Sequence, residues 1–437
     1  MNHRSGRRVL IVGTSWSPAM PASVHRSRLL AWSLPQAGWQ ATVLTAGPRF
    51  QQSEWLDNGG AAFFPPHTEV HEVAPSGDWL WSRLGVGGIG WRAFLPLLQR
   101  GRALLRERRF DLVYLSATQF NLFCLGPIWK RLCGVPYVLD FHDPWYRPGQ
   151  RITTGGAAWK SSLGNSLSRY MEAFAVNSAA GLVSVSPEYL RVLRDRYPGA
   201  EGLAEGRAVT IPFGVREEDF NAAPPDGISE ERSPSFDVVY VGVGAEIMAK
   251  SFRAIAESLA RLRRKGDPLV GQLRIRLFGT DGRWRAGRPK ILHEVATEAG
   301  VGDLVDEQPT ILAYRKALAL ATGADGLLVL GVDDPAYMPS KLFLYASTGK
   351  PMLASMRHDS QVIGYFTKYS DLGRLMQFGR GAADEEGNDE ALQLFLQDMA
   401  SGKSFARTEV RHDFSAQKMA ECHAELFEGI AAARSPR

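Results

Sequence analysis

Short runs of apolar, β-branched residues alternate with amphipathic segments along the whole chain. Each run is nearly continuous in hydrophobicity, which is typical of strands buried on both faces of a parallel sheet. In the first half, the predicted strands are Val9–Val12, Ala41–Thr45, Leu112–Ser116, Tyr137–Phe141, Gly181–Val185 and Val209–Ile211. Helical periodicity lies between several of them, at Arg26–Ala37, Trp91–Arg108 and Ser186–Arg196. The repeated order of strand, helix and strand predicts a doubly wound parallel sheet.

A segment rich in proline, serine and acidic residues interrupts this pattern at residues 221–235, and is the best candidate for a linker. The pattern then starts again. The predicted strands are Val238–Val241, Leu273–Phe278, Gly326–Leu330 and Met352–Ala354, and the predicted helices are Ser251–Lys265, Lys290–Ala299, Ala313–Thr322 and Ser415–Ala433. Gly379–Asn388, rich in glycine and acidic residues, is predicted to be a mobile loop. We therefore expect two Rossmann-like α/β domains, at residues 1–220 and 221–414.

The composition agrees with a folded chain of two domains. Its 437 residues exceed the usual size of one core, and 45% hydrophobic and 22% charged residues are ordinary values for a folded protein. The three cysteines, Cys124, Cys133 and Cys422, show no metal-ligand spacing, which favours a reducing compartment over a disulfide framework. No run of 18 apolar residues is present, so we expect no membrane span and a cytoplasmic location.

Positive charge is concentrated in the first half of the chain. The net charge is +5, with 24 Lys and Arg against 17 Asp and Glu in residues 1–220, and 27 against 29 in residues 221–437. The first half is therefore the better candidate to meet a phosphate or an anionic membrane surface. The segment Trp91–Phe110 could dock on anionic lipid through Arg92, Arg100, Arg102, Arg106, Arg108 and Arg109. Its leucines recur at core-facing spacing, so an ordinary surface helix is the alternative.

Ligands of open α/β sheets bind at the carboxyl ends of the strands, so the functional residues should lie in the loops that follow strands. Two such sheets joined by one linker would face each other across a cleft. The loop after the first predicted strand opens a helix, whose free N–H groups could face an anion. Its Ser15, His25 and Arg26 are candidates for contact with a phosphate or an acceptor substrate. A plain connection with a solvated arginine is the alternative.

A second candidate loop follows the predicted strand Tyr137–Phe141. It concentrates acidic, imidazole and aromatic groups in the sequence Asp-Phe-His-Asp-Pro-Trp-Tyr, residues 140–146. His142 could donate a hydrogen bond or a proton to a substrate hydroxyl, with Asp140 or Asp143 orienting its ring. In the structural alternative, Asp143 caps the next turn and His142 is a packing group.

A third loop follows the first predicted strand of the second half, and suits a phosphate site. Gly242 and Gly244 would let the backbone approach a ligand closely, and Lys250 could neutralise the charge of a leaving phosphate. Gly279, after the next strand, is assigned to the same donor site. Ile247 stands where a dinucleotide fingerprint has its third glycine, so binding of NAD is not expected.

The fourth loop precedes a predicted helix late in the second half. Pro339 and Ser340 suit the start of that helix, whose N-terminus would face a diphosphate, and Lys341 adds positive charge. Asp333 and Asp334 have no further ligand at metal spacing, so a solvated loop is favoured and no metal site is predicted.

These loops, in this order, resemble the retaining GT-B glycosyltransferases of family 4. The resemblance rests on YVLDFHDPW (137–145), GLVSVSPEYLRVL (181–193), VTIPFGV (209–215) and PSKLFLYASTGKP (339–351), and extends over nearly the whole chain. RHDFSAQKMAECHAELF (411–427) is similar to the helix by which that family's chain crosses back to its first domain, here residues 415–437. The implied fold is GT-B, with His142 contacting the donor.

The resemblance also implies an activity. The sugar of a UDP- or GDP-type donor would pass to a glycan or a lipid-linked acceptor, with retention and without metal or cofactor. Nucleic acid is not an implied partner, and the chain could lie peripherally at the inner face of a membrane.

Several positions depart from the family pattern, among them Pro21-Ala22-Ser23 in place of a Gly-Gly pair in the first loop and Lys250, which matches only with a short insertion. Leu344 replaces the glutamate that holds the donor's ribose, Val243 replaces an arginine on the diphosphate, and Phe213 replaces an asparagine. A lost buried hydrogen bond costs about 1–3 kcal/mol, which weakens a donor site without abolishing it, and an acid such as Asp334 could compensate. Leu344 and Val243 favour an alternative, a catalytically degenerate binding subunit of a glycan-assembly complex. A nucleotide-sugar epimerase shares the architecture and is a further alternative.

Overall fold

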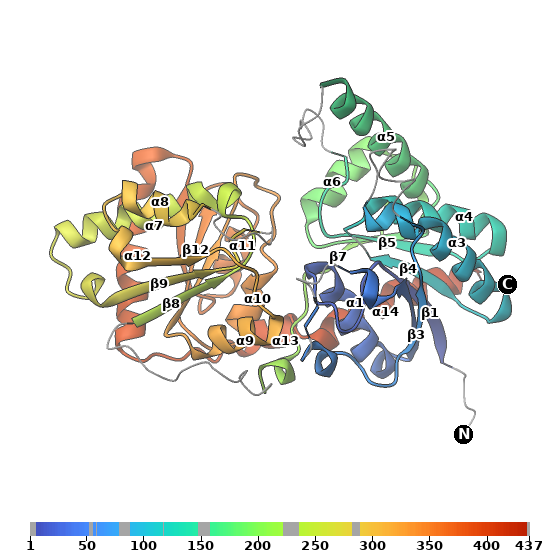
Figure 1. Cartoon of the computed structure of the whole chain (residues 1–437), viewed down its shortest axis with the longest axis horizontal. Helices are drawn as coiled ribbons and strands as arrows, with labels where there is room; N and C mark the ends of the chain where they lie inside the picture. The colour runs from blue at the N-terminus through green and yellow to red at the C-terminus, as the bar shows by residue number, and fades with distance from the viewer. Residues whose placement is uncertain are drawn as a thin grey trace. The chain divides into compact units, whose positions relative to one another are not determined.

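The computed structural model describes residues 6–51, 56–57, 59–77, 88–116, 118–146, 158–221, 236–281 and 289–434. The chain divides into two compact units, each with a parallel sheet and flanking helices (Figure 1). The N-terminal unit comprises Met1–Gly214 and Ala416–Arg437, and the C-terminal unit comprises Val215–Ser415. The unit boundaries thus lie at 214/215 and 415/416, where the sequence suggested 220/221 and 414/415. Most of the expected linker, residues 222–235, lies outside the described residues.

The sheet of the N-terminal unit has seven parallel strands in the order β3-β2-β1-β4-β5-β6-β7. They are β1 (Arg7–Val12), β2 (Trp39–Ala46), β3 (Glu69–Val73), β4 (Leu112–Ser116), β5 (Tyr137–Phe141), β6 (Gly181–Ser184) and β7 (Ala208–Thr210). The chain builds outward from β1 on one side and then returns to β4 on the other. This reversal places the topological switch point, where such sheets bind ligands, at the carboxyl ends of β1 and β4.

Helices cover both faces of this sheet (Figure 1). One face carries α3 (Ile89–Glu107), α4 (Leu125–Cys133), α5 (Ala158–Val176) and α6 (Pro187–Arg196), and the other carries α1 (Ala22–Ser33) and α14 (Ala416–Arg434). Shorter 3₁₀ turns are η1 (Leu34–Ala37), η2 (Pro48–Phe50), η4 (Gly60–Phe63), η5 (Phe120–Cys124) and η6 (Glu201–Leu203). The C-terminal helix α14 packs beside α1, so the first and last α-helices of the described chain share one layer.

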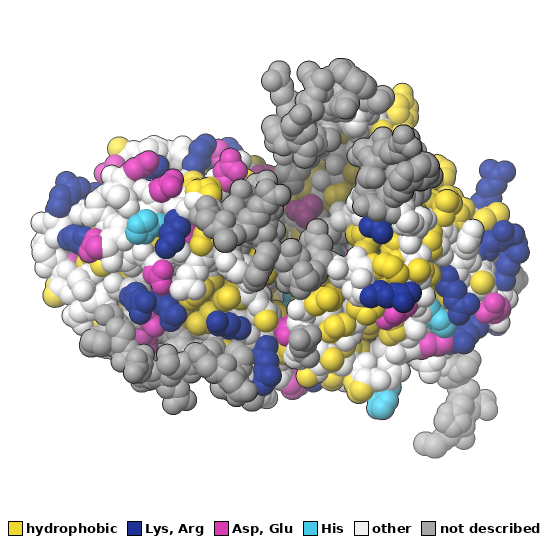
Figure 2. Space-filling model, viewed as in Figure 1, with side chains coloured by type: hydrophobic (Ala, Val, Ile, Leu, Met, Phe, Trp, Pro, Cys, Tyr) yellow, Lys and Arg dark blue, Asp and Glu magenta, His cyan; other side chains and the backbone are white. Residues whose placement is uncertain are grey.

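Exposed arginines gather along α3 and α4. Figure 2 shows Lys and Arg side chains over this edge of the N-terminal unit. Three of the six arginines between residues 92 and 109 form hydrogen bonds within the unit. Arg92 donates to the Ser76 carbonyl, Arg100 to His71 and Arg108 to Glu69. The other three are exposed, and α4 adds a fourth exposed arginine: Arg102, Arg106, Arg109 and Arg131.

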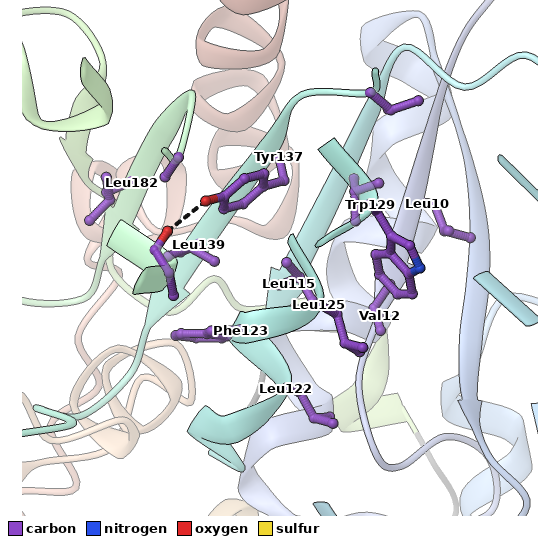
Figure 3. Packing of buried hydrophobic residues seen from close by; sticks show 14 of the residues in the cluster. Leu10, Val12, Leu115, Leu122, Phe123, Leu125, Trp129, Tyr137, Leu139 and Leu182 are labelled. Carbon is purple, nitrogen blue, oxygen red and sulfur yellow. Dashed lines mark hydrogen bonds between the residues drawn. The ribbon is translucent and has the colours of Figure 1, made fainter. Parts of the chain in front are cut away.

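The core of the N-terminal unit lies between the sheet and the layer of α3 to α6. Figure 3 shows strand and helix side chains packed together there: Leu10, Val12, Leu115, Leu125 and Trp129. The hydroxyl of Tyr137 donates a hydrogen bond to the carbonyl of Ala175 at 2.6 Å, which ties β5 to the end of α5. Burial of this many large apolar side chains is the main source of stability for the unit.

The sheet of the C-terminal unit has six parallel strands in the order β10-β9-β8-β11-β12-β13. They are β8 (Phe236–Val241), β9 (Leu273–Phe278), β10 (Val305–Gln308), β11 (Gly326–Leu330), β12 (Met352–Arg357) and β13 (Arg374–Phe378). The chain again reverses direction across the sheet, here between β8 and β11. The switch point of this unit therefore lies at the carboxyl ends of β8 and β11.

The helices of the C-terminal unit also form two layers (Figure 1). α7 (Ala245–Arg264), α8 (Ile291–Glu298) and α12 (Glu385–Ala400) pack on one face and bury the main core, whereas α9 (Tyr314–Gly323) and α10 (Lys341–Ala346) lie on the other. The remaining short elements are α11 (Ile363–Lys368), α13 (Thr408–Asp413), η7 (Glu217–Asn221), η8 (Val270–Gln272), η9 (Gly302–Leu304) and η10 (Gly381–Asp384). This architecture is the two-domain α/β fold that the sequence predicts.

The predicted mobile loop at Gly379–Asn388 is wrong. η10 occupies its middle, and α12 begins at Glu385. The side chain of Asn388 is buried and bonds both backbone groups of Gln377, accepting from its N–H and donating to its carbonyl, each at 2.7 Å. These two bonds fix the start of α12 to β13, so a segment with loop-like composition is held by one amide side chain.

Helices α3 and α4 approach each other so closely that Gly101 has no room for a side chain. A Cβ there would lie 2.2 Å from Cζ2 of Trp129, which is itself fixed by a 3.1 Å hydrogen bond from its Nε1 to the Leu98 carbonyl. We expect Gly101→Ala to lower the free energy of unfolding by about 1–2 kcal/mol, because overpacking outweighs the roughly 1 kcal/mol by which helices favour alanine. Urea unfolding followed by circular dichroism measures this change.

The matched control is Gly364→Ala in α11, where a Cβ would meet no atom within 4 Å. That variant should hold or slightly raise the stability. Equal effects of the two substitutions would contradict the proposed tight contact between α3 and α4.

Candidate functional site

Polar side chains of the N-terminal unit meet at the carboxyl ends of β4 and β5. The two strands pair in parallel with Ser116 opposite Asp140, so residues of both strands reach the same edge. Tyr114, Ser116 and Asp140 are polar residues inside strands whose every residue is buried. His142 follows β5 directly and is also buried. This edge adjoins the switch point, where a ligand site is expected.

Asp140 is the centre of this cluster, and its side chain is fully buried. Its Oδ2 atom accepts hydrogen bonds from the Tyr114 hydroxyl at 2.6 Å and the Ser116 hydroxyl at 3.1 Å, and lies 2.7 Å from Nε2 of His142. Nε of Arg26, 3.2 Å away, completes a buried ion pair. A buried charge with this many partners is held in one place.

The charge of Asp140 is stable because of these partners. Burial on its own raises the pKa of this carboxyl, but the Arg26 guanidinium and the His142 ring outweigh it and hold the pKa well below its usual range. The same environment raises the pKa of Tyr114 well above normal, first through burial and then through the neighbouring carboxylate. Asp140 is therefore ionised and Tyr114 is neutral at physiological pH.

Arg26 does not occupy the position expected from the sequence. Its side chain is fully buried, and its two terminal nitrogens donate to the carbonyls of Ile211 at 2.7 Å and Pro212 at 2.8 Å. The guanidinium also lies over the ring of Phe213, 5.0 Å from its centroid. The predicted contact of Arg26 with an acceptor is wrong, because the guanidinium faces inward and ties α1 to β5 and to the loop after β7.

The C-terminal helix α14 reaches the base of this cluster through His423. Its Nε2 lies 3.2 Å from the Tyr114 hydroxyl, and its Nδ1 donates to the Met419 carbonyl at 2.7 Å. Burial, followed by the nearby Arg26 charge, lowers the pKa of His423 to about 3, so this ring is neutral. Residues more than 300 positions apart in sequence thus build one polar network.

His142 is oriented by Asp140 and not by Asp143, which is exposed. The ring edge of His142 also packs on Phe213, with centroids 5.3 Å apart and planes at 73°. The other two acceptor-side candidates, Ser15 and His25, form hydrogen bonds within the N-terminal unit. Ser15 donates to Gln51 at 2.9 Å, and Nδ1 of His25 accepts from Arg28 at 3.2 Å.

A second group of candidate residues lies at the carboxyl ends of β8 and β9 in the C-terminal unit. A Cβ on Gly242 would lie 2.6 Å from Nζ of Lys341 and 2.7 Å from the Tyr240 hydroxyl, so only glycine fits beneath this amine. Gly279 has a left-handed φ of 69°, and a Cβ there would lie 3.9 Å from the Gly242 nitrogen. The structure therefore brings Gly242, Gly279 and Lys341 together, as the sequence suggested.

The glycine amides themselves are already occupied. Gly242 donates to the carbonyl of Phe278 at 2.8 Å, and Gly244, with a positive φ of 125°, donates to the carbonyl of Thr280 at 3.0 Å. The hydroxyl of Thr280 in turn donates to the buried carboxylate of Glu307 at 2.5 Å. The loop after β8 is thus fixed to the end of β9. Gly242 allows the Lys341 amine to lie close to the backbone, and Gly244 adopts a positive φ that other residues rarely adopt.

Lys341 is a partly exposed lysine with no ion pair or hydrogen bond to its amine among the described residues. Its Nζ lies 6.0 Å from the centroid of the Tyr240 ring, and burial lowers its pKa from 10.5 to about 8. It is the first residue of α10, which has six residues. Ser340 occupies the N-cap position without a capping hydrogen bond from its side chain, and the Pro339 carbonyl accepts from Leu342 at 3.1 Å.

Lys250 lies in a different environment from Lys341. It is exposed on α7 and forms an ion pair with Asp333, which also pairs with Arg357 at 3.2 Å. The hydrogen bond from Lys250, opposed by a little burial, lowers the pKa of Asp333. Asp334 accepts a hydrogen bond from the Ala336 amide at 2.9 Å. Within the described ranges, no three His, Cys, Asp or Glu side chains converge as a metal site would require.

The two positions that depart from the family pattern are apolar on this unit. The side chain of Val243 is 46% exposed, and that of the neighbouring Ile247 is 61% exposed. Leu344 on α10 is half-buried. Neither side chain can donate or accept a hydrogen bond. Whatever binds beside them meets apolar surface at these two positions.

Comparison with known proteins gives a family for part of the chain and a fold for nearly all of it. Residues 23–214 match the family described as the glycosyl transferase 4-like domain. This segment of the N-terminal unit thus matches a glycosyltransferase family. The matched region is nearly the whole first segment of the N-terminal unit, and contains Asp140 and His142. No curated protein matches the chain in a sequence search.

Solved structures share the fold over almost the full chain at low identity. HepE from Anabaena, in complex with UDP and glucose, is 15% identical, with 97% of this chain and 100% of that chain covered at a TM-score of 0.62. Sucrose-phosphate synthase from Thermosynechococcus elongatus is 14% identical, with coverage of 98% and 100% and a TM-score of 0.64. A trehalose-phosphate synthase from Burkholderia vietnamiensis is 12% identical, with coverage of 98% and 100% and a TM-score of 0.59.

Sequence reasoning found His142 and Asp140 but missed the network that holds them. Tyr114, Ser116, Phe213 and His423 were not predicted as members of the site. A signal for two of them was present, because Tyr114 and Ser116 are polar residues in a strand predicted to be buried on both faces. Buried polar groups require partners, so such residues point to a network.

In the described part of the chain, no helix has the length and apolar character needed to cross a bilayer.

The Arg26–Asp140 pair should be essential for the stability of the N-terminal unit. We expect Arg26→Met to lower the free energy of unfolding at pH 7 by about 3–5 kcal/mol, because Asp140 would remain as an unpaired buried charge. The loss should shrink as the pH falls. Without Arg26, burial raises the pKa of Asp140 above its unfolded value, and protonation at acid pH then removes the penalty. Urea unfolding at several pH values measures both effects.

The control for this variant is Arg191→Met on α6, which removes exposed ion pairs with Glu188 and Asp195. Its effect should stay below about 1 kcal/mol at every pH. A pH-independent loss in the Arg26 variant would show that packing, rather than the uncompensated carboxylate, causes the destabilisation.

Proposed function

We propose that this chain is a glycosyltransferase that transfers a sugar from a nucleotide diphosphate donor to a glycan or lipid-linked acceptor, with retention of configuration and without a metal ion. The observation that carries the donor assignment is the Lys341 amine above Gly242, which has no ion pair among the described residues. A cation placed in this way, at the carboxyl ends of parallel strands, is suited to a diphosphate. The UDP-sugar complexes of HepE support a donor of this class.

In this proposal Lys341 stabilises the charge that develops on the departing diphosphate. The absence of a side chain at Gly242 leaves the space beside its amine open to phosphate oxygens. Lys250 follows Gly242 by eight residues, but its charge is balanced by Asp333, so it contributes only if the ligand displaces that carboxylate. Transfer with retention and without metal then depends on positioning and electrostatics.

His142 is proposed to contact a hydroxyl of the bound sugar. The ring is held on one side by Asp140 and packed edge-on against Phe213, so its direction is fixed before substrate binds. Preorganisation of this kind is what a positioning group requires, because no free energy is then spent on ordering the ring. The proposed catalytic role belongs to His142, and Asp143 is set aside because it is exposed and Asp140 makes the contact.

The second candidate is a catalytically degenerate subunit that binds a partner enzyme or a glycan. Val243, which is exposed, and Leu344 favour it, since they replace the arginine and the glutamate of the family pattern. A degenerate subunit would bind no nucleotide, so the two candidates differ in a property that is simple to measure.

Binding of nucleotides to the purified full chain tests the proposed function. We expect UDP or GDP compounds to bind in calorimetry, and Lys341→Met to weaken that binding at least tenfold through loss of a charge-assisted contact. Affinity should fall as the pH rises through about 8, since the Lys341 amine then loses its proton. Lys265→Met, which removes another lysine of the same unit at the far end of α7, should bind like wild type.

Lys341→Met should weaken nucleotide binding without lowering the free energy of unfolding. The folded pKa of Lys341 lies below its unfolded value, so burial of the ammonium opposes folding below pH 8, and this cost disappears as the pH rises toward 10.5. Lys341→Met should therefore keep or raise the free energy of unfolding at pH 7. Loss of binding together with loss of stability would assign Lys341 a structural role, and no binding by wild type would favour the degenerate subunit.

We also propose peripheral contact with an anionic membrane at the cytoplasmic face. The support is the group of exposed arginines on α3 and α4, defined above, whose guanidinium groups face solvent (Figure 2). Basic side chains near a membrane surface gain about 1 kcal/mol each from anionic lipid. Arg102→Glu with Arg106→Glu should abolish sedimentation with phosphatidylglycerol vesicles at low salt.

The control is Arg263→Glu with Arg264→Glu, which makes the same charge change on the C-terminal unit and should sediment like wild type. High salt should release the wild-type chain, because the attraction is screened. Binding that persists in the α3 variant would show that another surface meets the lipid.

A further inference from the structure

The bond between Asp140 and His142 determines which nitrogen of the imidazole carries the proton. We propose that Asp140 is a positioning residue that holds His142 in its Nε2–H form, so that Nδ1 meets the substrate as a hydrogen-bond acceptor. The inference rests on the proposed function for the identity of the substrate, and it reverses the donor role that the sequence suggested for this ring. The group recognised by His142 would then be a hydroxyl that donates its own proton.

Nε2 of His142 lies 2.7 Å from Oδ2 of Asp140, which is hydrogen-bonding distance. The low pKa of Asp140 means that this oxygen carries no proton. An ionised carboxylate can only accept hydrogen bonds, so Nε2 must be the donor. A lone pair on Nε2 at this distance would face the negative charge of the oxygen directly.

The other neighbour of Nε2 is the Ser116 hydroxyl, whose oxygen lies 3.1 Å from it. This hydroxyl has one proton, and it lies at the same distance of 3.1 Å from Oδ2 of Asp140. Donation to the carboxylate is favoured because charge-assisted hydrogen bonds are the stronger ones. The Ser116 oxygen therefore presents a lone pair to Nε2–H. This contact leaves Nε2 as the hydrogen-bond donor.

Nδ1 of His142 carries no proton when the neutral ring is protonated at Nε2. A neutral imidazole has one N–H, so a protonated Nε2 leaves Nδ1 with a free lone pair. Among the described residues, Nδ1 of His142 forms no hydrogen bond. Arg26 already balances the charge of Asp140, so the whole group carries no net charge while the ring is neutral. The acceptor nitrogen thus remains available beside the switch point of the sheet.

The tautomer can be read directly, without any substrate. We would record long-range ¹H–¹⁵N correlations of the full chain labelled with ¹⁵N-histidine, at about pH 8, above the ordinary histidine pKa of about 6.5. The signals of His142 are assigned by their absence in His142→Gln. The proposal expects the chemical shifts and coupling pattern of the Nε2–H form. An Nδ1–H ring, or a doubly protonated one, would overturn it.

A variant links the tautomer to Asp140. The amide of Asp140→Asn can donate to Nε2, so we expect His142 to populate the Nδ1–H form in this variant and kcat for sugar transfer to fall at least tenfold. The affinity for free nucleotide diphosphate should not change, because the proposed diphosphate ligand Lys341 belongs to the other unit. The matched control is Tyr114→Phe, which also removes a partner of Oδ2 but should keep the Nε2–H form.

The outcomes separate this inference from the proposed function. An Nε2–H ring in a chain that binds no nucleotide would retain the Asp140–His142 assignment and refute the donor proposal. An Nε2–H ring that persists in Asp140→Asn, with kcat unchanged, would refute the positioning role. If Asp140→Asn does not fold, because Arg26 loses its counter-charge, the wild-type spectrum alone still decides the tautomer.

Discussion

The buried ion pair between Arg26 and Asp140 is the constraint on which the N-terminal unit depends. It joins α1, β5 and the loop after β7 at a point from which water is excluded, and the charges cannot separate without a large cost. Tyr114 and His423 extend the same network to β4 and α14. An apolar core would have filled this volume at lower cost, so the polar network is best understood as a device that fixes His142.

Much of the fold could be predicted from the sequence, because the inner strands of a parallel sheet are buried on both faces and read as apolar runs. β4, β5, β9 and β11 have the predicted bounds. The three missed strands are β3, β10 and β13, and each lies at the edge of its sheet. An edge strand is only partly covered, so sequences such as VDEQ in β10 carry polar residues in place of a continuous apolar run.

The candidate site was predicted less completely, for a related reason. The loops after strands are close to one another by topology, which is why Gly242, Gly279 and Lys341 could be grouped before the structure was known. The partner of a given side chain is a different matter, since it depends on helix packing. Arg26 has the same sequence context whether it faces solvent or the core. Only the positions of α1 and α14 against the sheet show that it meets a carboxylate.

The membership of α14 in the N-terminal unit affects how this chain can acquire its structure. The C-terminal unit is one continuous segment, so it holds all of its own strands and helices before α14 has left the ribosome. The N-terminal unit, although synthesised first, must wait for residues 416–434 to cover the face where Trp39 and Tyr114 contact Phe427. Domains of a nascent chain usually fold in order of synthesis, and this chain can complete them only in reverse order.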